Sequence, residues 1–412
     1  MNKGLKQDSD RADGFDSQKH GAVVLLFASS LYVTSAVITS SLPLMAEEFR
    51  SLPSAEILVK LALTLPTLFI ALISPLTGKL SDLWGRKKIL FWGLIIYGIG
   101  GSSGFYLQDI RLILLGRGLL GLGLGTTFTM ASALIGDFYS GDRRRRLLGL
   151  QGAFVSLGGM IFVGGAGFLA EISWRTPFLV YLLSFLILPA AAILKEPPRL
   201  KPAVLEESKR KRNPVGLILL IYLSVFLCMI FLLMIHTQLP FVLKQQNRSS
   251  TSLMGGILIL LNLASFFTAS FYHKIRRQLS PVMIYGLYFV LMGAGFILIG
   301  LKPGLLGLFG GILLCGLGTG LVVPNTSVWL QDISIPESRG QILGYMTASA
   351  FLGQFLSPLL LQPILTRLPE GTLFFRVGIS VLILGFGYGI LNLLSKLKSA
   401  VKKTTAVKNL HI

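Results

Sequence analysis

Residues 78–88 read Gly78-Lys79-Leu80-Ser81-Asp82-Leu83-Trp84-Gly85-Arg86-Lys87-Lys88, a polar loop between two long apolar runs. Gly78 and Gly85 permit a tight turn and the close approach of neighbouring helices. Asp82 can accept hydrogen bonds from backbone N–H groups at a helix N-terminus. Arg86 can form an ion pair with an acid, and Asp137, at the end of a later apolar run, is its natural partner. The loop therefore predicts a structured polar junction.

The apolar runs around this loop have the length of membrane-spanning helices. A bilayer core of about 30 Å requires roughly 20 apolar residues per helix. Charged residues make up 14% of the 412-residue chain, far below the share in soluble domains, which excludes an ordinary soluble enzyme. We therefore predict an all-α integral membrane protein with twelve transmembrane helices. The runs are 21–43, 57–77, 88–107, 111–131, 147–170, 176–194, 215–238, 253–272, 281–301, 304–324, 341–365 and 373–394.

The positive charge predicts the orientation. With both termini in the cytoplasm, the inner segments hold most of the 38 lysine and arginine residues. Basic residues favour the cytoplasmic side, so we expect a multi-pass protein of the cell membrane with both ends inside. The net charge of +20 is then explained by the inner loops, and no nucleic-acid partner is expected.

Polar segments divide the chain into two groups of six helices. Proline and charge in 195–214 exclude this segment from hydrocarbon and predict a cytoplasmic linker. It separates a first bundle, 21–194, from a second, 215–394. Segment 1–20 is expected to be a flexible cytoplasmic N-terminus, and 395–412 a basic cytoplasmic tail.

The two halves share a repeated pattern. Five residues of the first half recur 195 positions later, and parallel six-helix repeats are typical of transporters. The residues are Asp137, Asp142, Arg144, Leu148 and Gly149, which recur as Asp332, Glu337, Arg339, Leu343 and Gly344.

The 78–88 loop resembles the signature loop of the major facilitator superfamily, G-x-x-x-D-[RK]-x-G-[RK]-[RK], with Leu83 in place of a basic residue. The resemblance covers essentially the whole chain and implies the two-bundle transporter fold. It also implies that the loop residues and Asp137 form a conformational latch on the cytoplasmic side. The latch residues are Gly78, Asp82, Gly85, Arg86 and Asp137. The equivalent second-half loop, 271–277, lacks the acid, so no latch is expected there.

Arg117 lies inside the fourth apolar run, where an ionised group is costly unless it has a partner or meets water. Its surroundings resemble the arginine motif of the twelve-helix drug–proton antiporters, which implies a role in proton transfer. Snorkelling to the interface is the alternative. The glycine-rich fifth run resembles the same branch, although Val163 stands at the expected proline position and Pro358 occupies the equivalent place in the second half. These glycines serve helix packing equally well.

No acidic residue is placed at mid-membrane, which disfavours cationic substrates and favours neutral or anionic ones. Candidates for coupling protons to substrate are Arg117, Glu171 and His236. The candidates for lining a substrate cavity are Tyr32, Thr34, Tyr222, Gln238, Asn262, Asn325 and Gln354. For each polar member of this set, a structural role between helices is the alternative.

The sequence predicts a secondary transporter that works by alternating access, with proton-coupled efflux of a small drug-like or metabolite molecule as the leading hypothesis. An uptake permease or uniporter is the alternative, and a membrane enzyme or receptor is a third. No nucleotide-binding loop or metalloprotease motif supports the third hypothesis. We expect no catalytic residue, no metal and no cofactor, with a proton gradient as the energy source. The expected partners are a small molecule and the lipid bilayer, and the expected working unit is a monomer.

Overall fold

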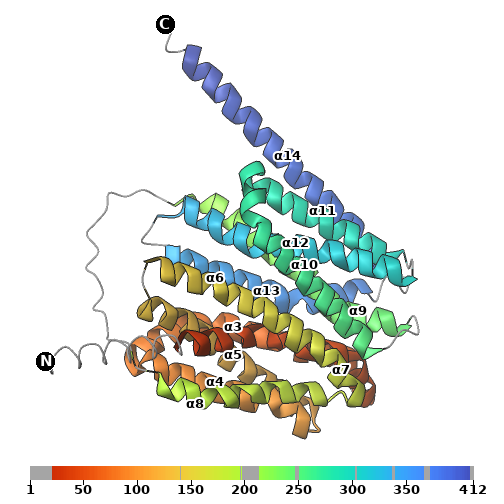
Figure 1. Cartoon of the computed structure of the whole chain (residues 1–412). Helices are drawn as coiled ribbons and strands as arrows, with labels where there is room; N and C mark the ends of the chain where they lie inside the picture. The colour runs from red at the N-terminus through yellow and green to blue at the C-terminus, as the bar shows by residue number, and fades with distance from the viewer. Residues whose placement is uncertain are drawn as a thin grey trace, which may run out of the picture. The chain divides into compact units, whose positions relative to one another are not determined.

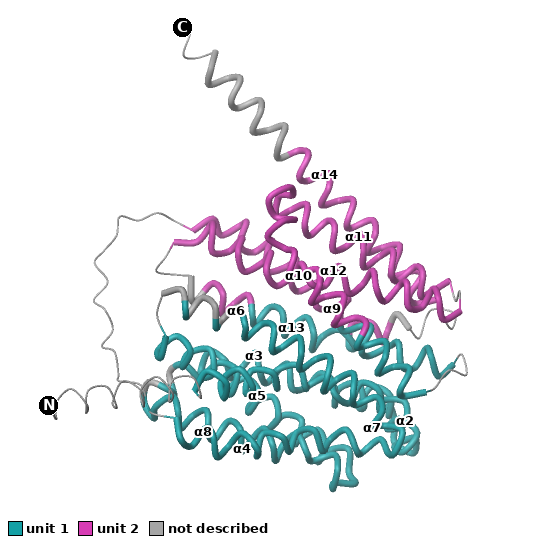
Figure 2. The backbone as a smooth tube through the Cα atoms, viewed as in Figure 1, with its two compact units in different colours: residues 1–211, 233–259, 347–359 teal, residues 212–232, 260–346, 360–412 magenta. Residues whose placement is uncertain are grey.

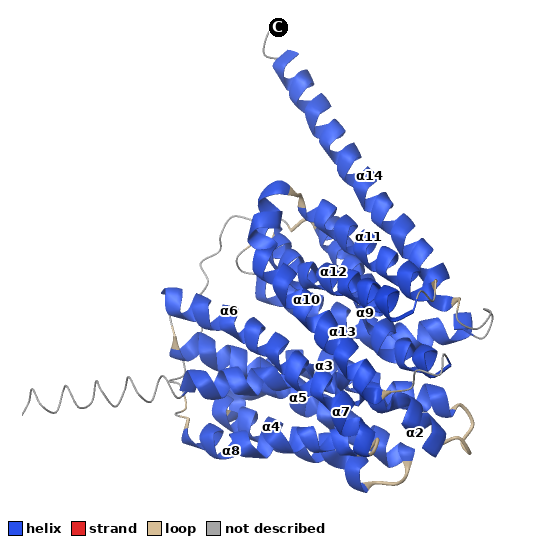
Figure 3. Cartoon of the chain, turned by 45° about the vertical axis from the view of Figure 1, so that its right-hand side comes forward, coloured by secondary structure: helices blue, strands red, loops and turns tan. Residues whose placement is uncertain are grey.

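The computed structural model describes residues 21–139, 141–194, 196, 213–245, 250–301, 304–335, 339–365 and 372–408. Within these residues all regular structure is helical (Figure 3). Segment 1–20 and most of the predicted linker 195–214 lie outside the described residues. The side chain of Asp82 also lies outside the description.

The helices follow one another with short connections (Figure 1). The first span begins at residues 21–30 and continues through a 3₁₀ segment, η1 (Leu31–Ser41), into α2 (Leu42–Glu48). The other elements are α3 (Ala55–Trp84), α4 (Arg86–Tyr106), α5 (Ile110–Phe138), α6 (Gly141–Gly158), η2 (Gly159–Gly164), α7 (Gly165–Ile172), η3 (Thr176–Leu182), α8 (Leu183–Ile193), α9 (Val215–Gln245), α10 (Thr251–Gln278), α11 (Pro281–Gly300), α12 (Gly304–Ile333), α13 (Arg339–Leu365) and α14 (Leu373–Lys408).

These helices confirm the prediction of an all-α membrane fold. In the described part of the chain, eleven helices are long and apolar enough to cross a bilayer. The twelfth predicted span, 341–365, is also helical and forms most of α13, where polar residues such as Thr347 and Gln354 interrupt the apolar sequence. At its far end, α14 continues as a helix into the predicted tail and reaches Lys408.

Glycines allow the helices to pack closely. Helix α4 runs along α5, and a Cβ added at Gly100 or Gly123 would meet the backbone of the facing helix. Gly293 and Gly378 are placed in the same way between α11 and α14. Because lipid tails are as apolar as the side chains, close van der Waals packing is a main source of helix association in a bilayer.

The described helices form two compact units, coloured separately in Figure 2. Unit 1 comprises residues 1–211, 233–259 and 347–359, and unit 2 comprises 212–232, 260–346 and 360–412. The units differ from the predicted bundles because the C-terminal part of α9, the first residues of α10 and the middle of α13 pack with the first half. Unit 1 therefore contains contacts between residues of both sequence repeats.

Candidate functional site

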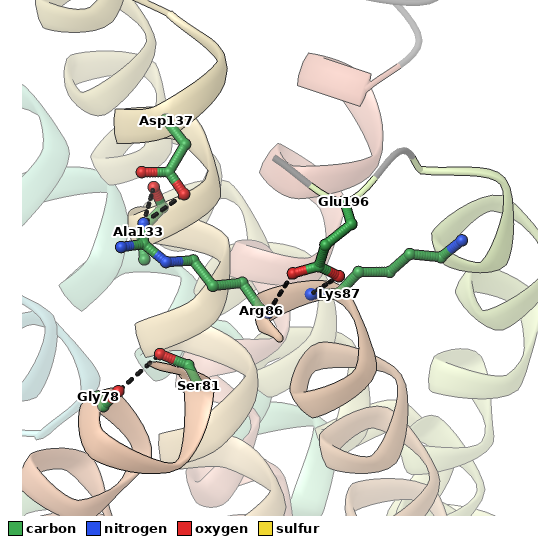
Figure 4. A network of polar contacts seen from close by, with 7 residues as sticks. All are labelled: Gly78, Ser81, Arg86, Lys87, Ala133, Asp137 and Glu196. Atoms are coloured by element: carbon green, nitrogen blue, oxygen red, sulfur yellow. Dashed lines mark hydrogen bonds and ion pairs between the residues drawn. The ribbon is translucent and has the colours of Figure 1, made fainter. Parts of the chain in front are cut away.

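The 78–88 loop forms the predicted ion pair. Arg86, the first residue of α4, places Nη1 against the Asp137 carboxylate near the end of α5 (Figure 4). The same nitrogen donates to the carbonyl of Ala133 at 3.3 Å, one turn earlier in α5. Arg86 thus ties the start of α4 to the end of α5 through one side chain.

Glu196, just beyond α8, is a second acid at this junction. Its carboxylate accepts hydrogen bonds from the backbone N–H of Arg86 at 2.6 Å and of Lys87 at 3.1 Å (Figure 4). These N–H groups lie in the first turn of α4, where a negative charge is favourable. The sequence analysis missed Glu196, although its position directly after an apolar run was a usable signal.

The two loop glycines differ in their structural roles. Gly85 lies between α3 and α4 with φ of +93° and ψ of +146°, a conformation restricted largely to glycine. A Cβ at Gly85 would also collide with the Glu196 carboxylate. At Gly78 an added Cβ would meet no described atom within 4 Å. The expectation of a close helix approach therefore does not hold at Gly78, whose carbonyl instead accepts from Ser81 Oγ at 2.7 Å (Figure 4).

The second half also contains an ion pair, although its 271–277 loop lacks the acid and no latch was expected there. Arg276 Nη2 in α10 lies 3.9 Å from Asp332 Oδ2 in α12. Asp332 in α12 is the repeat equivalent of Asp137 in α5. The second half therefore keeps this acid, although it lacks an equivalent of Asp82. Both side chains are substantially exposed, and a pair of this kind contributes little stability.

Arg117 is completely buried, so its guanidinium does not reach the protein surface. Nε donates to the carbonyl of Ala62 in α3 at 2.6 Å, and Nη2 donates to the carbonyl of Ser35 in η1 at 2.7 Å. Nη1 donates to the Tyr181 hydroxyl in η3 at 2.6 Å. One guanidinium on α5 therefore joins three other elements.

Pro66 explains why Arg117 finds an acceptor inside α3. A proline has no N–H, so Pro66 cannot donate to the carbonyl four residues earlier, which is that of Ala62. Arg117 Nε supplies the missing donor. One turn further along α5, Gly121 lies so close to Pro66 that an added Cβ would meet the Pro66 backbone. The proline thus creates the acceptor, and the glycine lets α5 approach it.

The Arg117 cluster extends to Thr34, one of the predicted cavity residues. The Tyr181 hydroxyl donates to the Thr34 carbonyl at 2.8 Å, and Thr34 Oγ1 lies 2.7 Å from the Tyr97 hydroxyl. All these groups are buried. In this structure Thr34 is part of a helix-linking polar network, which favours the structural alternative for this residue.

The other coupling candidates, Glu171 and His236, lie apart from the hydrogen-bond partners of Arg117 in the described part of the chain. Glu171 is exposed in α7. His236 is buried in α9 and lies in the same unit as Arg117. Neither ion pairing nor hydrogen bonding links these two side chains to the Arg117 guanidinium among the described contacts.

The cavity candidates divide between the two units. In unit 1, Tyr32 stacks on Phe128, with ring centroids 4.0 Å apart, and meets the edge of Phe351 at 5.6 Å. Gln354 lies in the part of α13 that belongs to the same unit, half-buried. Tyr32 therefore belongs to an aromatic cluster that joins residues of both sequence repeats.

Unit 2 holds three of the cavity candidates, Tyr222, Asn262 and Asn325. The Tyr222 hydroxyl donates to the carbonyl of Ile342 at 2.8 Å. Asn325 is buried, and its Nδ2 donates to the carbonyl of Pro281 at 3.1 Å. Asn262 is half-buried in α10. Tyr222 and Asn325 thus link helices, and Asn325 Oδ1 is a buried oxygen with no hydrogen-bond donor in the structure.

Lys60 is a second buried cation, to which sequence reasoning gave no role. It lies in the second turn of α3 with no exposed surface. Its Nζ pairs with Glu56, one turn earlier, and donates to Gln238 Oε1 in α9 at 2.8 Å. Gln238, another predicted cavity residue, is therefore placed beside a charge. The signal in the sequence was a lysine inside the second apolar run.

The fifth span departs from α geometry around Val163, where the resemblance to antiporters implied a proline. Residues Gly159–Gly164 form a π-helical segment that contains the buried Val163. Such segments are rare and frequently accompany functional sites. On the next helix, α7, Gly167 faces Gly255 of α10 so closely that a Cβ would meet its backbone.

No group of three or more metal-binding side chains occurs among the residues that the structure describes. The two cysteines, Cys228 and Cys315, are free and buried. The polar groups described above are suited to holding helices in defined positions. They provide no nucleophile paired with a base.

Comparisons with known proteins place this arrangement in a family. The sequence profile of the Major Facilitator Superfamily matches residues 24–358. Among curated relatives, the quinolone resistance protein NorA of Staphylococcus aureus strain MSSA476 is 21% identical over 320 residues, which cover 75% of this chain and 81% of NorA. The multidrug transporter protein MdtP of Bacillus subtilis is 27% identical over 163 residues, 39% of this chain and only 29% of MdtP.

Solved structures share the fold at low sequence identity. A D-xylose–proton symporter has a TM-score of 0.74 with 16% identity, covering 89% of this chain and 96% of the symporter. A peptide transporter crystallised with sulfate has a TM-score of 0.72 with 14% identity, covering 90% and 94%.

The long apolar helices define a multi-pass membrane protein. The chain belongs to the Major Facilitator Superfamily. Membership of this family indicates a transporter rather than an enzyme.

Proposed function

We propose that this transporter exports a small neutral or anionic molecule across the cell membrane in exchange for protons, by alternating access. Both termini would lie in the cytoplasm, the working unit would be a monomer, and the proton gradient would be the energy source, with no cofactor. The predicted division into bundles 21–194 and 215–394, joined by the linker 195–214, would supply the two moving parts.

The Arg117 network is the observation that carries this proposal. A completely buried guanidinium held by α3, η1 and η3 contributes a fixed positive charge inside the spans. Charged groups within transmembrane segments are expensive and mark substrate or proton pathways. The names of NorA and MdtP, a quinolone resistance protein and a multidrug transporter, support export by this chain.

The sign of the buried charge supports the substrate class. Among the described side chains, the buried charged residues are Lys60 and Arg117, and no buried aspartate or glutamate accompanies them. A cationic substrate would meet like charge in a low dielectric, which is unfavourable. Neutral or anionic molecules avoid this penalty.

The experiment compares cells that produce the protein with cells that lack it, both exposed to a panel of fluorescent anionic and neutral amphiphilic compounds. Export predicts higher accumulation of at least one compound in cells without the protein. Cells that produce the Arg117→Ala variant should resemble those cells, provided that the variant reaches the membrane in normal amount. Equal accumulation in all three cell lines across the panel would contradict export.

An uptake permease or uniporter is the second candidate, favoured by Val163 in place of the antiporter proline. The π-helical segment Gly159–Gly164 supports export instead. It distorts the fifth span at Val163, where the resemblance to antiporters implied that a proline would do so. Uptake predicts the opposite sign in the same experiment, with lower accumulation in cells without the protein.

A further inference from the structure

Lys60 lies at the end of α3 opposite the 78–88 loop. Twenty-four residues separate Lys60 from Trp84 at the helix end, or about 36 Å along the axis. The Arg86–Asp137 and Arg276–Asp332 pairs each join residues of the same sequence repeat. Lys60 and Gln238, by contrast, come from different repeats and meet within unit 1. If the two repeats move apart at this end of α3, the contact between Lys60 and Gln238 must break.

The surroundings of Lys60 combine one ionic partner with incomplete polar pairing. Glu56 is 46% exposed, so its charge is partly screened by solvent, whereas Lys60 has no exposed surface. Phe241 of α9 covers the ammonium, with Nζ 4.7 Å from the ring centroid. Gln238 accepts from Lys60, but its own Nε2 is buried without an acceptor. Lys60 and Gln238 are therefore bound to each other, while one hydrogen-bond donor of the Gln238 amide lacks an acceptor.

The helix that carries Gln238 is weakened at the same place. Pro240 lies inside α9 and has no N–H to donate to the preceding turn, so the helix lacks one internal hydrogen bond there. Prolines are a common cause of bends in helices. The segment that contacts Lys60 can therefore change direction more easily than the rest of α9.

We propose that Lys60 is a polar latch that holds α3 to α9 at the end of the molecule opposite the 78–88 loop. The inference rests on the alternating access of the proposed function. In the closed arrangement the ammonium is held by Glu56, Gln238 and Phe241. When this end opens, Gln238 and Phe241 leave and water hydrates the ammonium. Burial disfavours the charge while the contacts favour it, which keeps the two arrangements close in free energy.

A nearby ion pair serves as a matched control. Lys244, six residues after Gln238, pairs with Glu47 in α2, again between repeats. Both of these side chains are more than a third exposed, so this pair is screened by solvent and contributes little. If exposed charges held this end closed, Glu47→Gln would open it. If Lys60 holds this end closed, Glu47→Gln should change the ratio of open to closed molecules by less than about twofold.

The test measures distances between spin labels at Ser51 and Gln245, both exposed residues at this end. Both are changed to cysteine in a protein with the two native cysteines replaced by serine, and the protein is studied in lipid nanodiscs. Gln238→Leu leaves a buried cation beside an apolar side chain. It should raise the ratio of long to short distances by at least about fivefold, because the buried ammonium loses its hydrogen bond to Gln238 only in the closed arrangement, and a lost hydrogen bond to a buried charged group is costly.

Lys60→Met combined with Gln238→Leu should reverse this change. The double variant places two apolar side chains in the closed contact, so the ratio should return to the parent value or below it. Gln238→Glu, which adds an ionic partner, should lower the ratio. If Gln238→Leu and the double variant give the same distances, or if Gln238→Glu raises the ratio, Lys60 is not the latch.

The outcome is separable from the fate of the proposed function because no substrate is added. Distances that respond as stated, in a protein that moves none of the tested compounds, would support the latch and count against proton-coupled export. If the protein transports a compound but the distances do not change in the variants, the proposed function would be supported and the latch would be contradicted. Variants are compared only after gel filtration shows a single folded species. If Gln238→Leu fails to fold, the Gln238→Glu distances decide the question.

Discussion

At the scale of single residues, Arg117 shows how one side chain can depend on a planar geometry. Its three hydrogen bonds run to the Ala62 and Ser35 carbonyls and the Tyr181 hydroxyl from three different nitrogens. A lysine ammonium is a compact charge on a flexible stem and cannot reproduce that fork. Charge alone is therefore insufficient at this position.

We expect Arg117→Lys to lower transport by at least about tenfold, because one or more buried hydrogen bonds to a charged group are lost. The measurement is the initial rate of transport in vesicles, normalised to the amount of folded protein. Tyr181→Phe is the control that keeps the charge, and it should cost less than Arg117→Lys. Full activity of the lysine variant would show that the guanidinium fork is dispensable.

Gly85 makes a prediction about stability. Its backbone conformation is largely restricted to glycine, and a Cβ there would meet Glu196. Gly85→Ala should reduce stability by about 1–3 kcal/mol, which a thermal unfolding experiment in detergent can detect. Adding Glu196→Ala removes the collision but leaves the strained backbone, so it should restore only part of the loss. Complete restoration would mean that the conformation itself carries no cost.

The Arg86–Asp137 pair tests the latch that the loop implies. Both side chains are only partly buried, so the pair is expected to contribute on the order of 1 kcal/mol. Asp137→Asn should therefore slow turnover several-fold while substrate affinity changes little. Transport rates measured over a range of substrate concentrations separate the two effects. A large loss of affinity at normal turnover would place Asp137 in substrate binding instead.

At the scale of helices, the fifth span illustrates how closely two elements approach. Gly167 in α7 faces the backbone of α10 at Gly255, whereas Gly165, two residues earlier, has no described atom within 4 Å of an added Cβ. Gly167→Ala should overpack this contact by about 1–3 kcal/mol and reduce transport. Gly165→Ala should change the free energy of unfolding by no more than about 0.5 kcal/mol and leave the transport rate within about twofold of the parent. Thermal unfolding and transport rates of the two variants provide the comparison, and equal behaviour would contradict close packing as the reason for Gly167.

The sequence predicted the helices well because their lengths follow from the thickness of the bilayer. The twelve apolar runs coincide with helical structure, apart from the last residue of 88–107, 176–194 and 281–301, and the Arg86–Asp137 pair formed as expected. It could not reveal the π-helical turn at Gly159–Gly164, since no residue there requires one. The sequence pattern also did not indicate the contact of Arg276 with Asp332, because the acid lies on another helix and not in the 271–277 loop.

The contact of Lys60 with Gln238 could not be predicted from the sequence. A lysine near the start of a span reads as an interfacial residue, and its partner Gln238 lies 178 residues away. Only the fold brings them together. The bond between Arg117 and Ala62 was more accessible to sequence reasoning, because Pro66 stands four residues after Ala62 and removes its helical donor.

At the scale of the whole molecule, the two ends of α3 differ in their chemistry. The end near the 78–88 loop carries the partly exposed Arg86–Asp137 pair, which joins two residues of the first repeat. The other end of α3 carries a buried cation that joins residues of both repeats. Under the proposed mechanism the Arg86–Asp137 pair stabilises the first half, and the Lys60 contact governs whether the two repeats separate at its end of α3. The central claim is that this cycle exchanges a substrate for protons.

The most direct test is proton movement in inside-out membrane vesicles that contain the protein, energised to hold a pH gradient and given a panel of anionic and neutral amphiphilic compounds. The account predicts that at least one compound dissipates the gradient, and that vesicles with the Arg117→Ala variant show no such response. An unchanged pH gradient across the whole panel, with transport of a labelled compound still measurable in the same vesicles, would contradict proton exchange.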